Sequence, residues 1–156
     1  MHIAPLRPED RARWELLARG YKAFYETPTS DGQYELTWRR LLAHDGIAGL
    51  GATLDGRLVG IAHYLFHTTV WAPRTCYLQD LYTDAEVRGR GVARALIEAL
   101  ASEAREQGAQ RLYWLTQSNN TTARALYDKV ATHSGFIRYE RPLDPLRTAR
   151  PLRGRT

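Results

Sequence analysis

The sequence predicts a mixed α/β (α+β) fold in which helices cover the faces of a central sheet. Helical and strand patterns alternate along the chain, and a two-residue turn signal joins two of the strands. No internal repeat or low-complexity linker divides the 156 residues. We therefore expect residues 1–156 to form a single domain, which is long enough to bury a sizeable core.

The N-terminal half predicts two helices followed by three strands. Trp14, Leu17 and Tyr21 lie at helical spacing, which indicates an amphipathic helix. Asp55 and Gly56 separate two apolar strand patterns and are typical of the turn in an antiparallel hairpin. The expected ranges are 9–25 and 33–44 for the helices, and 47–54, 57–69 and 75–83 for the strands.

The C-terminal half predicts alternating helices and strands. Val92, Leu96 and Leu100 form one apolar stripe, and Gly108 ends that helix. Asn119 or Asn120 can cap the last helix. The expected ranges are 92–107 and 121–131 for the helices, and 111–117 and 135–143 for the strands.

Composition narrows the functional classes. The formal net charge of +5 favours an anionic ligand such as nucleic acid, a membrane surface or a phosphorylated molecule. Much of the excess lies in residues 141–156, which contain five arginines and three prolines, and we expect a flexible basic tail over residues 143–156. No apolar run reaches the roughly 18 residues of a membrane span, and no signal peptide is apparent, so we expect a cytoplasmic protein. The single cysteine, Cys76, permits neither an internal disulfide nor a CxxC motif.

A glycine-rich, cationic loop precedes the helix at 92–107. Gly89 and Gly91 let successive backbone N–H groups turn toward one point, and the helix N-terminus adds roughly half a positive charge there. Such a loop binds phosphate oxygens, and Arg88 and Arg90 can add forked contacts.

Other interpretations of this loop fit less well. A nucleotide P-loop requires a Gly-Lys pair, which the chain lacks. The dinucleotide fingerprint would place Arg94 where its third glycine belongs, and that side chain opposes close packing of helix on strand. A plain tight turn would explain the glycines but not the arginines beside them.

Two motifs resemble those of the GNAT superfamily of acetyl-CoA-dependent N-acetyltransferases. Residues 88–93, RGRGVA, match its pyrophosphate-binding pattern [QR]-x-x-G-x-[GA], and the preceding YLQDLYTDAEV is similar to its fourth strand and loop. Ala85 stands where many members have proline. Residues 120–129, NTTARALYDK, resemble the family helix N-x-x-A-x-x-L-Y-[ED]-K. The nearest branches are the polyamine and the histone and D-amino-acid acetyltransferases.

The resemblance implies a mixed, mainly antiparallel central sheet with helices on both faces. It implies a β-bulge that separates the fourth strand from the fifth, so that the main chain of Leu81 and Thr83 binds the pantetheine arm of acetyl-CoA. By resemblance, an N–H near Leu81 polarises the thioester carbonyl, and the Tyr127 hydroxyl donates a proton to the departing CoA thiolate. The expected acetyl-CoA contacts are Leu81, Tyr82, Thr83, Arg88, Gly89, Arg90, Gly91, Val92, Ala93, Asn120 and Tyr127.

The acceptor amine must lose a proton before it can attack. Asp80 is the leading acceptor for that proton, because LQDLYT resembles L-E-D-[IL]-Y-V in those two branches. Gln79 replaces their glutamate and cannot accept a proton at neutral pH, which argues against a two-carboxylate site. Asp80 can equally be a buried partner of an arginine, and His63 or His67 is an alternative base. No metal site is expected, since histidines four residues apart on a strand are about 13 Å apart.

The sequence thus predicts acetyl transfer from acetyl-CoA to a primary amine, directly within a ternary complex. Polyamines, amino acids, aminoglycosides, protein lysines and N-termini all remain open as acceptors. Substrate contacts are expected from an acidic and aromatic rim around residues 24–38, with Tyr25, Glu26, Tyr34 and Trp38 joining Asp80. Residues 131–134, ATHS, predict a last helix that is one turn longer than in relatives.

Two non-enzymatic alternatives remain: a CoA-binding regulatory or interaction module, and a basic nucleic-acid-binding domain. Tyr127 and the intact strand pattern at 75–83 favour the enzyme. No membrane partner is expected, nucleic acid is disfavoured, and a homodimer stays open.

Overall fold

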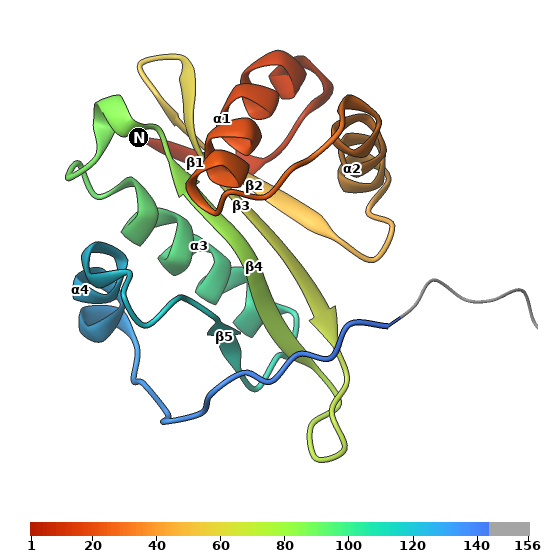
Figure 1. Cartoon of the computed structure of the whole chain (residues 1–156), viewed down its shortest axis with the longest axis vertical. Coiled ribbons are helices and arrows are strands. Elements are labelled where there is room, and N and C mark those ends of the chain that lie inside the picture. Colours follow the sequence, from red (N-terminus) through yellow and green to blue (C-terminus); the bar gives the residue numbers. More distant parts are fainter. Residues whose placement is uncertain (144–156) are drawn as a thin grey trace, which may run out of the picture.

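The computed structural model describes residues 1–143 and contains one five-stranded sheet with strand order β1-β2-β3-β4-β5 (Figure 1). Neighbouring strands are antiparallel, except that β4 and β5 are parallel. This arrangement confirms the predicted fold class. In chain order the elements are β1 (His2–Pro5), η1 (Pro8–Asp10), α1 (Arg11–Phe24), α2 (Asp31–Ala43), β2 (Ala48–Leu54), β3 (Arg57–His67), β4 (Thr75–Thr83), η2 (Ala85–Val87), α3 (Val92–Glu106), β5 (Leu112–Trp114) and α4 (Thr121–Val130).

Helices α1 and α2 cover one face of the sheet. Trp14 of α1 is completely buried, and its ring lies 4.8 Å from that of Trp38 on α2, measured between centroids. Both side chains belong to an apolar cluster that includes Leu58 and Ile61 of β3. Each tryptophan therefore belongs to the apolar stripe with which its helix packs on the sheet.

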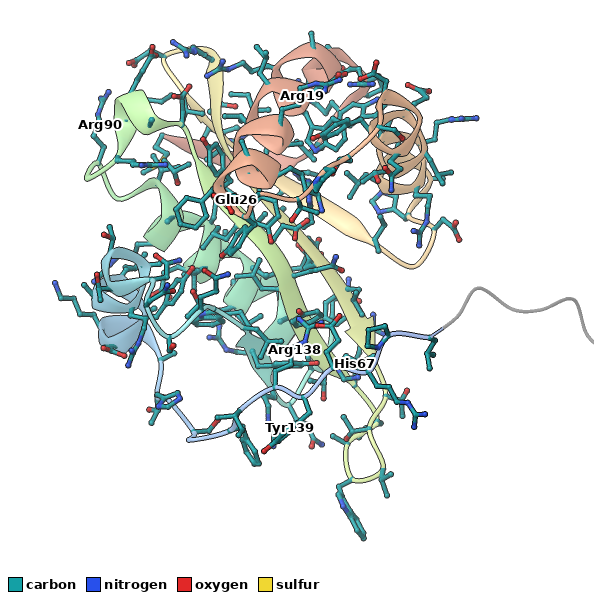
Figure 2. The ribbon with its side chains drawn as sticks, viewed as in Figure 1. Arg19, Glu26, His67, Arg90, Arg138 and Tyr139 are labelled. Atoms are coloured by element: carbon teal, nitrogen blue, oxygen red, sulfur yellow. The ribbon has the colours of Figure 1, made fainter. Side chains whose placement is uncertain are left out.

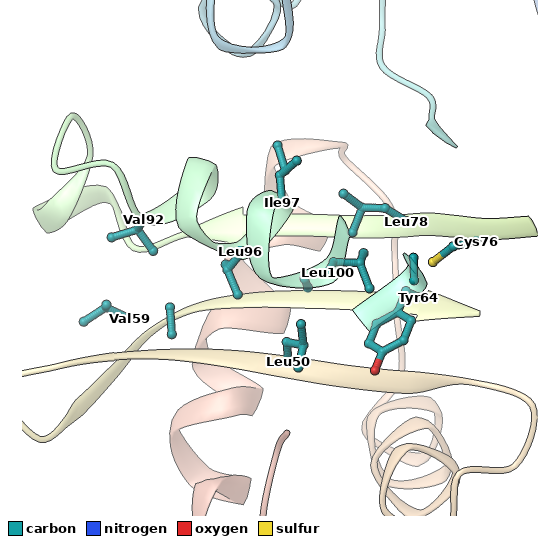
Figure 3. Packing of buried hydrophobic residues seen from close by; sticks show 12 residues of the cluster. Leu50, Val59, Tyr64, Cys76, Leu78, Val92, Leu96, Ile97 and Leu100 are labelled. Carbon is teal, nitrogen blue, oxygen red and sulfur yellow. The ribbon is translucent and has the colours of Figure 1, made fainter. Parts of the chain in front are cut away.

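Helix α3 covers the opposite face. Its buried stripe of Val92, Leu96 and Leu100 packs against strand residues such as Leu50 and Leu78 (Figure 3). The two clusters together confirm helices on both faces. Between β2 and β3, the predicted two-residue turn is present, with φ angles of 51° at Asp55 and 79° at Gly56.

Three expectations about the chain ends were wrong or incomplete. Residues 135–143 form no strand, and Phe136 and Tyr139 are 86% and 88% exposed. Alternating residues become a strand only beside an edge that pairs with them, and β5 offers an edge of just three residues. Helix α4 ends at Val130, so the predicted additional turn is absent. The sequence analysis also missed β1, which pairs with β2.

The predicted strand 111–117 is shorter than expected, because the ladder between β4 and β5 ends at the pair Leu78 and Trp114. The predicted basic tail lies outside the described residues from residue 144 onward. Within residues 1–143, no helix is both long and apolar enough to cross a bilayer. The same residues bring together no group of three His, Cys, Asp or Glu side chains suited to a metal ion.

Candidate active site

Strand β4 carries a bulge at its centre. His63 of β3 pairs with Asp80, whereas the next residue, Tyr64, pairs with Leu78, so Gln79 has no partner on β3. On its other side, β4 pairs with β5 only as far as Leu78. The bulge expected from the resemblance is therefore present, and the β5 side of β4 is unpaired from Gln79 onward within the described chain.

A small crevice of about 20 Å³ lies where β4 and β5 separate. It is about large enough for one water molecule. Half of its lining residues are aromatic. The lining comes from α1, β4, the β5 region and α4: Tyr21, Tyr25, Leu78, Gln79, Leu81, Trp114, Leu115 and Tyr127. The sequence motifs at 77–91 and 120–129 thus meet in space, although Leu81 and Tyr127 are 46 positions apart in the chain.

Tyr127 is half-buried in this crevice and lies edge-on to Trp114, with ring centroids 5.3 Å apart. Burial raises the pKa of Tyr127 to about 12, and the nearby Tyr25 adds to the shift. The phenol therefore keeps its proton at neutral pH and is able to donate it as an acid.

The loop between η2 and α3 has the glycine conformations that the predicted nest requires, and anion binding there stays a prediction. Gly89 and Gly91 have φ angles of 78° and 80°, in the left-handed region that favours glycine. Gly91 is the N-cap of α3 and provides no side-chain cap, so the first N–H groups of the helix remain available to an anion. Arg88 and Arg90 are exposed on this loop, where Figure 2 labels Arg90.

A charged network that the sequence analysis missed holds this loop against the sheet. Asp84 caps η2 by accepting a hydrogen bond from the Glu86 backbone N–H at 3.1 Å. Its carboxylate also pairs with Arg13 of α1 and, at 2.9 Å, with Arg57. The Nε of Arg13 donates to the Leu58 carbonyl at 2.8 Å. Only the tertiary fold brings these residues together, so sequence spacing contained no signal for them.

The remaining predicted acetyl-CoA contacts have restricted roles. The Val92 side chain belongs to the core, and the Tyr82 hydroxyl packs against Gly20 of α1. Each of these residues therefore has only its backbone to offer at the site. The Asn120 side chain caps α4 by accepting from the Ala123 N–H at 3.4 Å, as expected, and its contact with acetyl-CoA stays a prediction.

Asp80 ends a buried hydrogen-bond chain. The Trp14 indole N–H, which can only donate, lies 2.9 Å from His63 Nε2, so that nitrogen must accept. His63 Nδ1 therefore carries the hydrogen and donates it to Asp80 Oδ2, also at 2.9 Å. With its lone pair engaged by Trp14, His63 has no basic nitrogen to offer a substrate.

The hydrogen bonds from His63 and Tyr21 keep Asp80 ionised as a carboxylate. Burial alone would raise the pKa of Asp80, but the hydrogen bond from His63, together with one from Tyr21, holds it below its ordinary value. His67, the other alternative base, lies at the far end of β3 and pairs with Tyr113 at 3.0 Å, away from Glu26 in Figure 2. Asp80 therefore stays the predicted proton acceptor, and His63 positions it.

A second and larger cavity, of about 110 Å³, lies on the α2 side of β4. Gln79, the bulge residue, lines both this cavity and the crevice that contains Tyr127. Asp80 and His63 line the second cavity only. Its complete lining is Thr37, Arg40, Ile47, His63, Tyr64, Gln79 and Asp80.

The structure corrects the predicted substrate rim in part. Tyr34 and Trp38 are only 6% and 5% exposed, because their side chains form the core between α2 and the sheet. They cannot contact a substrate directly. Tyr25 lines the crevice, and Glu26 is exposed at the end of α1 (Figure 2), so these two stay predicted contacts.

Comparison with known proteins agrees with this geometry. Residues 13–131 match the model of the acetyltransferase (GNAT) family. The D-amino-acid N-acetyltransferase HPA3 of Saccharomyces cerevisiae is 33% identical over 145 residues, which cover 89% of each chain. The thialysine N-epsilon-acetyltransferase of Bos taurus is 28% identical over 116 residues, which cover 74% of this chain and 68% of the relative.

Solved structures share the fold. A ribosomal-protein-alanine N-acetyltransferase from Brucella melitensis superposes with a TM-score of 0.75 at 26% identity, over 92% of this chain and all of the other. AAC(6')-Iy, in complex with a bisubstrate analog of CoA and acetylneamine, has a TM-score of 0.80 at 19% identity, over 92% and 98% of the two chains. The family match spans both motifs and the strands between them, and the chain therefore belongs to the GNAT family of acetyltransferases.

Proposed function

We propose that this N-acetyltransferase moves the acetyl group of acetyl-CoA to a primary amine directly, within a ternary complex. The observation that carries the proposal is that two spaces share a lining residue at the β4 bulge. Tyr127 and Leu81 line one of them, Asp80 lines the other, and Gln79 lines both. A donor in the first space and an amine in the second would then react across the bulge.

The residues present suit acetyl-CoA, which supplies its acetyl group as a thioester. The nest at Gly89 and Gly91 and the uncapped start of α3 would bind its pyrophosphate. The unpaired side of β4 would bind its amide-rich arm. The buried Thr83 hydroxyl, which has no partner among the described residues, supports a polar ligand along this strand.

Two residues would handle protons during transfer. As the C–S bond breaks and the amine nitrogen bonds to the acetyl carbon, the Tyr127 hydroxyl donates its proton to the departing thiolate. Before attack, Asp80 attracts the cationic amine and receives its first proton. Because its pKa is lowered, Asp80 cannot keep that proton at neutral pH and passes it to solvent. After attack, the second proton leaves the new amide nitrogen to solvent, and solvent reprotonates the Tyr127 phenolate.

A covalent intermediate on the chain's cysteine does not fit this site. Cys76 is fully buried in the cluster under α3, and burial raises the pKa of its thiol to about 12. A thiol that is protonated and enclosed is a poor nucleophile. Direct transfer is therefore the better mechanism for this geometry.

Two measurements test the proposal. Isothermal titration with acetyl-CoA, CoA and a DNA duplex separates an enzyme or CoA-binding module from a nucleic-acid-binding domain. A panel of amines, assayed by release of the CoA thiol, then separates an enzyme from a silent CoA-binding module. We expect binding of acetyl-CoA and amine-dependent thiol release, and DNA binding without acetyl-CoA binding would refute the proposal.

A further inference from the structure

The cavity on the α2 side of β4 contains charges of both signs. Asp80 is its anionic residue, held as a carboxylate by His63 and Tyr21. Arg40 is the one arginine or lysine among the described residues that line it. A volume of about 110 Å³ holds several water molecules or a small polar ligand, since about 10–15 Å³ of the same measure suffices for one water.

Arg40 is positioned by α2 and only weakly engaged. Thr37 and Arg40 are three residues apart, so they share the helix face that lines the cavity. The Arg40 Nε lies 3.5 Å from the Asp45 carboxylate, and its Nη2 donates to the Asp45 carbonyl at 3.3 Å. Asp45 is 73% exposed, and such surface pairs contribute little. The guanidinium can therefore turn to a ligand at small cost.

We infer that the acceptor is an amino acid, whose amine faces Asp80 and whose carboxylate is bound by Arg40. This inference rests on the proposed function and names the substrate class of the same site. The planar guanidinium suits a carboxylate, because it offers two parallel N–H donors. The Thr37 hydroxyl adds a further donor on the same helix face.

The same charges disfavour polyamines. A diamine bound to Asp80 through one ammonium would carry its second cation in a cavity lined by Arg40, where like charges repel. An amine without a carboxylate would leave the guanidinium with no anionic partner in the ligand. Discrimination by Arg40 should therefore appear as a difference between amines that differ only in the carboxylate.

The test compares matched substrates and matched variants. Both enantiomers of lysine are measured against cadaverine, and both enantiomers of alanine against ethylamine, by thiol release. We expect kcat/KM for the better enantiomer to exceed that of its decarboxylated partner at least tenfold. Arg40→Gln should remove that advantage, mainly by raising KM for the amino acid, and Arg40→Lys should restore part of it.

Arg39→Gln is the control, because Arg39 is exposed, pairs with Glu35 at 3.3 Å and does not line the cavity. It should leave both kinds of substrate unchanged. Binding of acetyl-CoA and the unfolding midpoint report whether the Arg40 variants remain folded.

The outcomes separate this inference from the proposed function. If acetyl-CoA binds but none of the amines is acetylated, the proposed function fails. If cadaverine and ethylamine are acetylated as well as the amino acids, or if Arg40→Gln lowers both members of each pair equally, acetyl transfer stands and the carboxylate site is refuted.

Discussion

Removal of one hydroxyl from the β4 crevice tests the chemistry most directly. Tyr127→Phe keeps the ring that packs edge-on against Trp114 but removes the proton that Tyr127 is proposed to donate. General acids contribute about 10² to 10⁴ to rate. We expect the lower end, about 10² in kcat, because a phenol with a pKa of about 12 is a weaker acid than an ordinary thiol, near 8.5.

The raised pKa of Tyr127 leads to a second, independent prediction for the same residue. With a pKa of about 12, only about 1% of the Tyr127 phenol is ionised at pH 10, compared with half of an ordinary tyrosine. The wild-type kcat should therefore show no decline from loss of this proton up to about pH 10.

The assay is steady-state thiol release across pH, with acetyl-CoA affinity measured separately by titration. Tyr113→Phe is the matched control, because its hydroxyl pairs with His67 outside the crevice. Its kcat should equal that of the wild type. A Tyr127→Phe enzyme with unchanged kcat at every pH, or a wild-type decline centred near pH 10 that this variant abolishes, would refute the reasoning.

Three further changes test the nest and the acceptor side. Gly91→Val should weaken acetyl-CoA binding at least tenfold, about 1.4 kcal/mol by titration, because a β-branched residue resists the φ of 80°. The control is Gly108→Val, which has a φ of 74° at the far end of α3 and should lower stability without affecting acetyl-CoA affinity. Asp80→Asn should lower kcat/KM near pH 7 and recover partly at pH 9, where more amine arrives neutral, and a loss that is uniform with pH would instead indicate a structural role. His63→Leu should reduce the free energy of unfolding in urea at pH 7 by about 1.5–3 kcal/mol, since it removes a donor to a buried carboxylate. Because the folded-state pKa of Asp80 is lowered, its contribution to stability is present above the ordinary value of 3.8 and is lost as pH falls through the folded value. The deficit should therefore shrink below about pH 4, and a deficit that is constant down to pH 2 would contradict this role.

The chain's local patterns were sufficient for the fold class and for the backbone conformation of the loop before α3. Trp14 and Leu17 at helical spacing predicted α1, and Asp55 with Gly56 predicted the hairpin of β2 and β3. Gly91 predicted the sharp entry to α3. These features depend on neighbours within a few residues, so sequence spacing alone contains the geometry.

Features that depend on a neighbouring element were not accessible in the same way. The stripe containing Trp38 identified one face of α2, but nothing local distinguished a face packed on the sheet from one that binds substrate. Likewise, residues 135–143 have a strand pattern, but pairing requires an edge that the three-residue β5 does not supply.

The sequence by itself determined that this chain is a GNAT acetyltransferase with a glycine-rich, cationic loop before α3 and a tyrosine on its last described helix. The tertiary structure decided the state of the acceptor side. It placed Trp14 on His63 and His63 on Asp80, across separations of 49 and 17 residues, and brought Arg40 of α2 to the same cavity. Proton placement and charge pairing depend on distances of a few ångströms between elements, and those distances exist only after the helices have packed on the sheet.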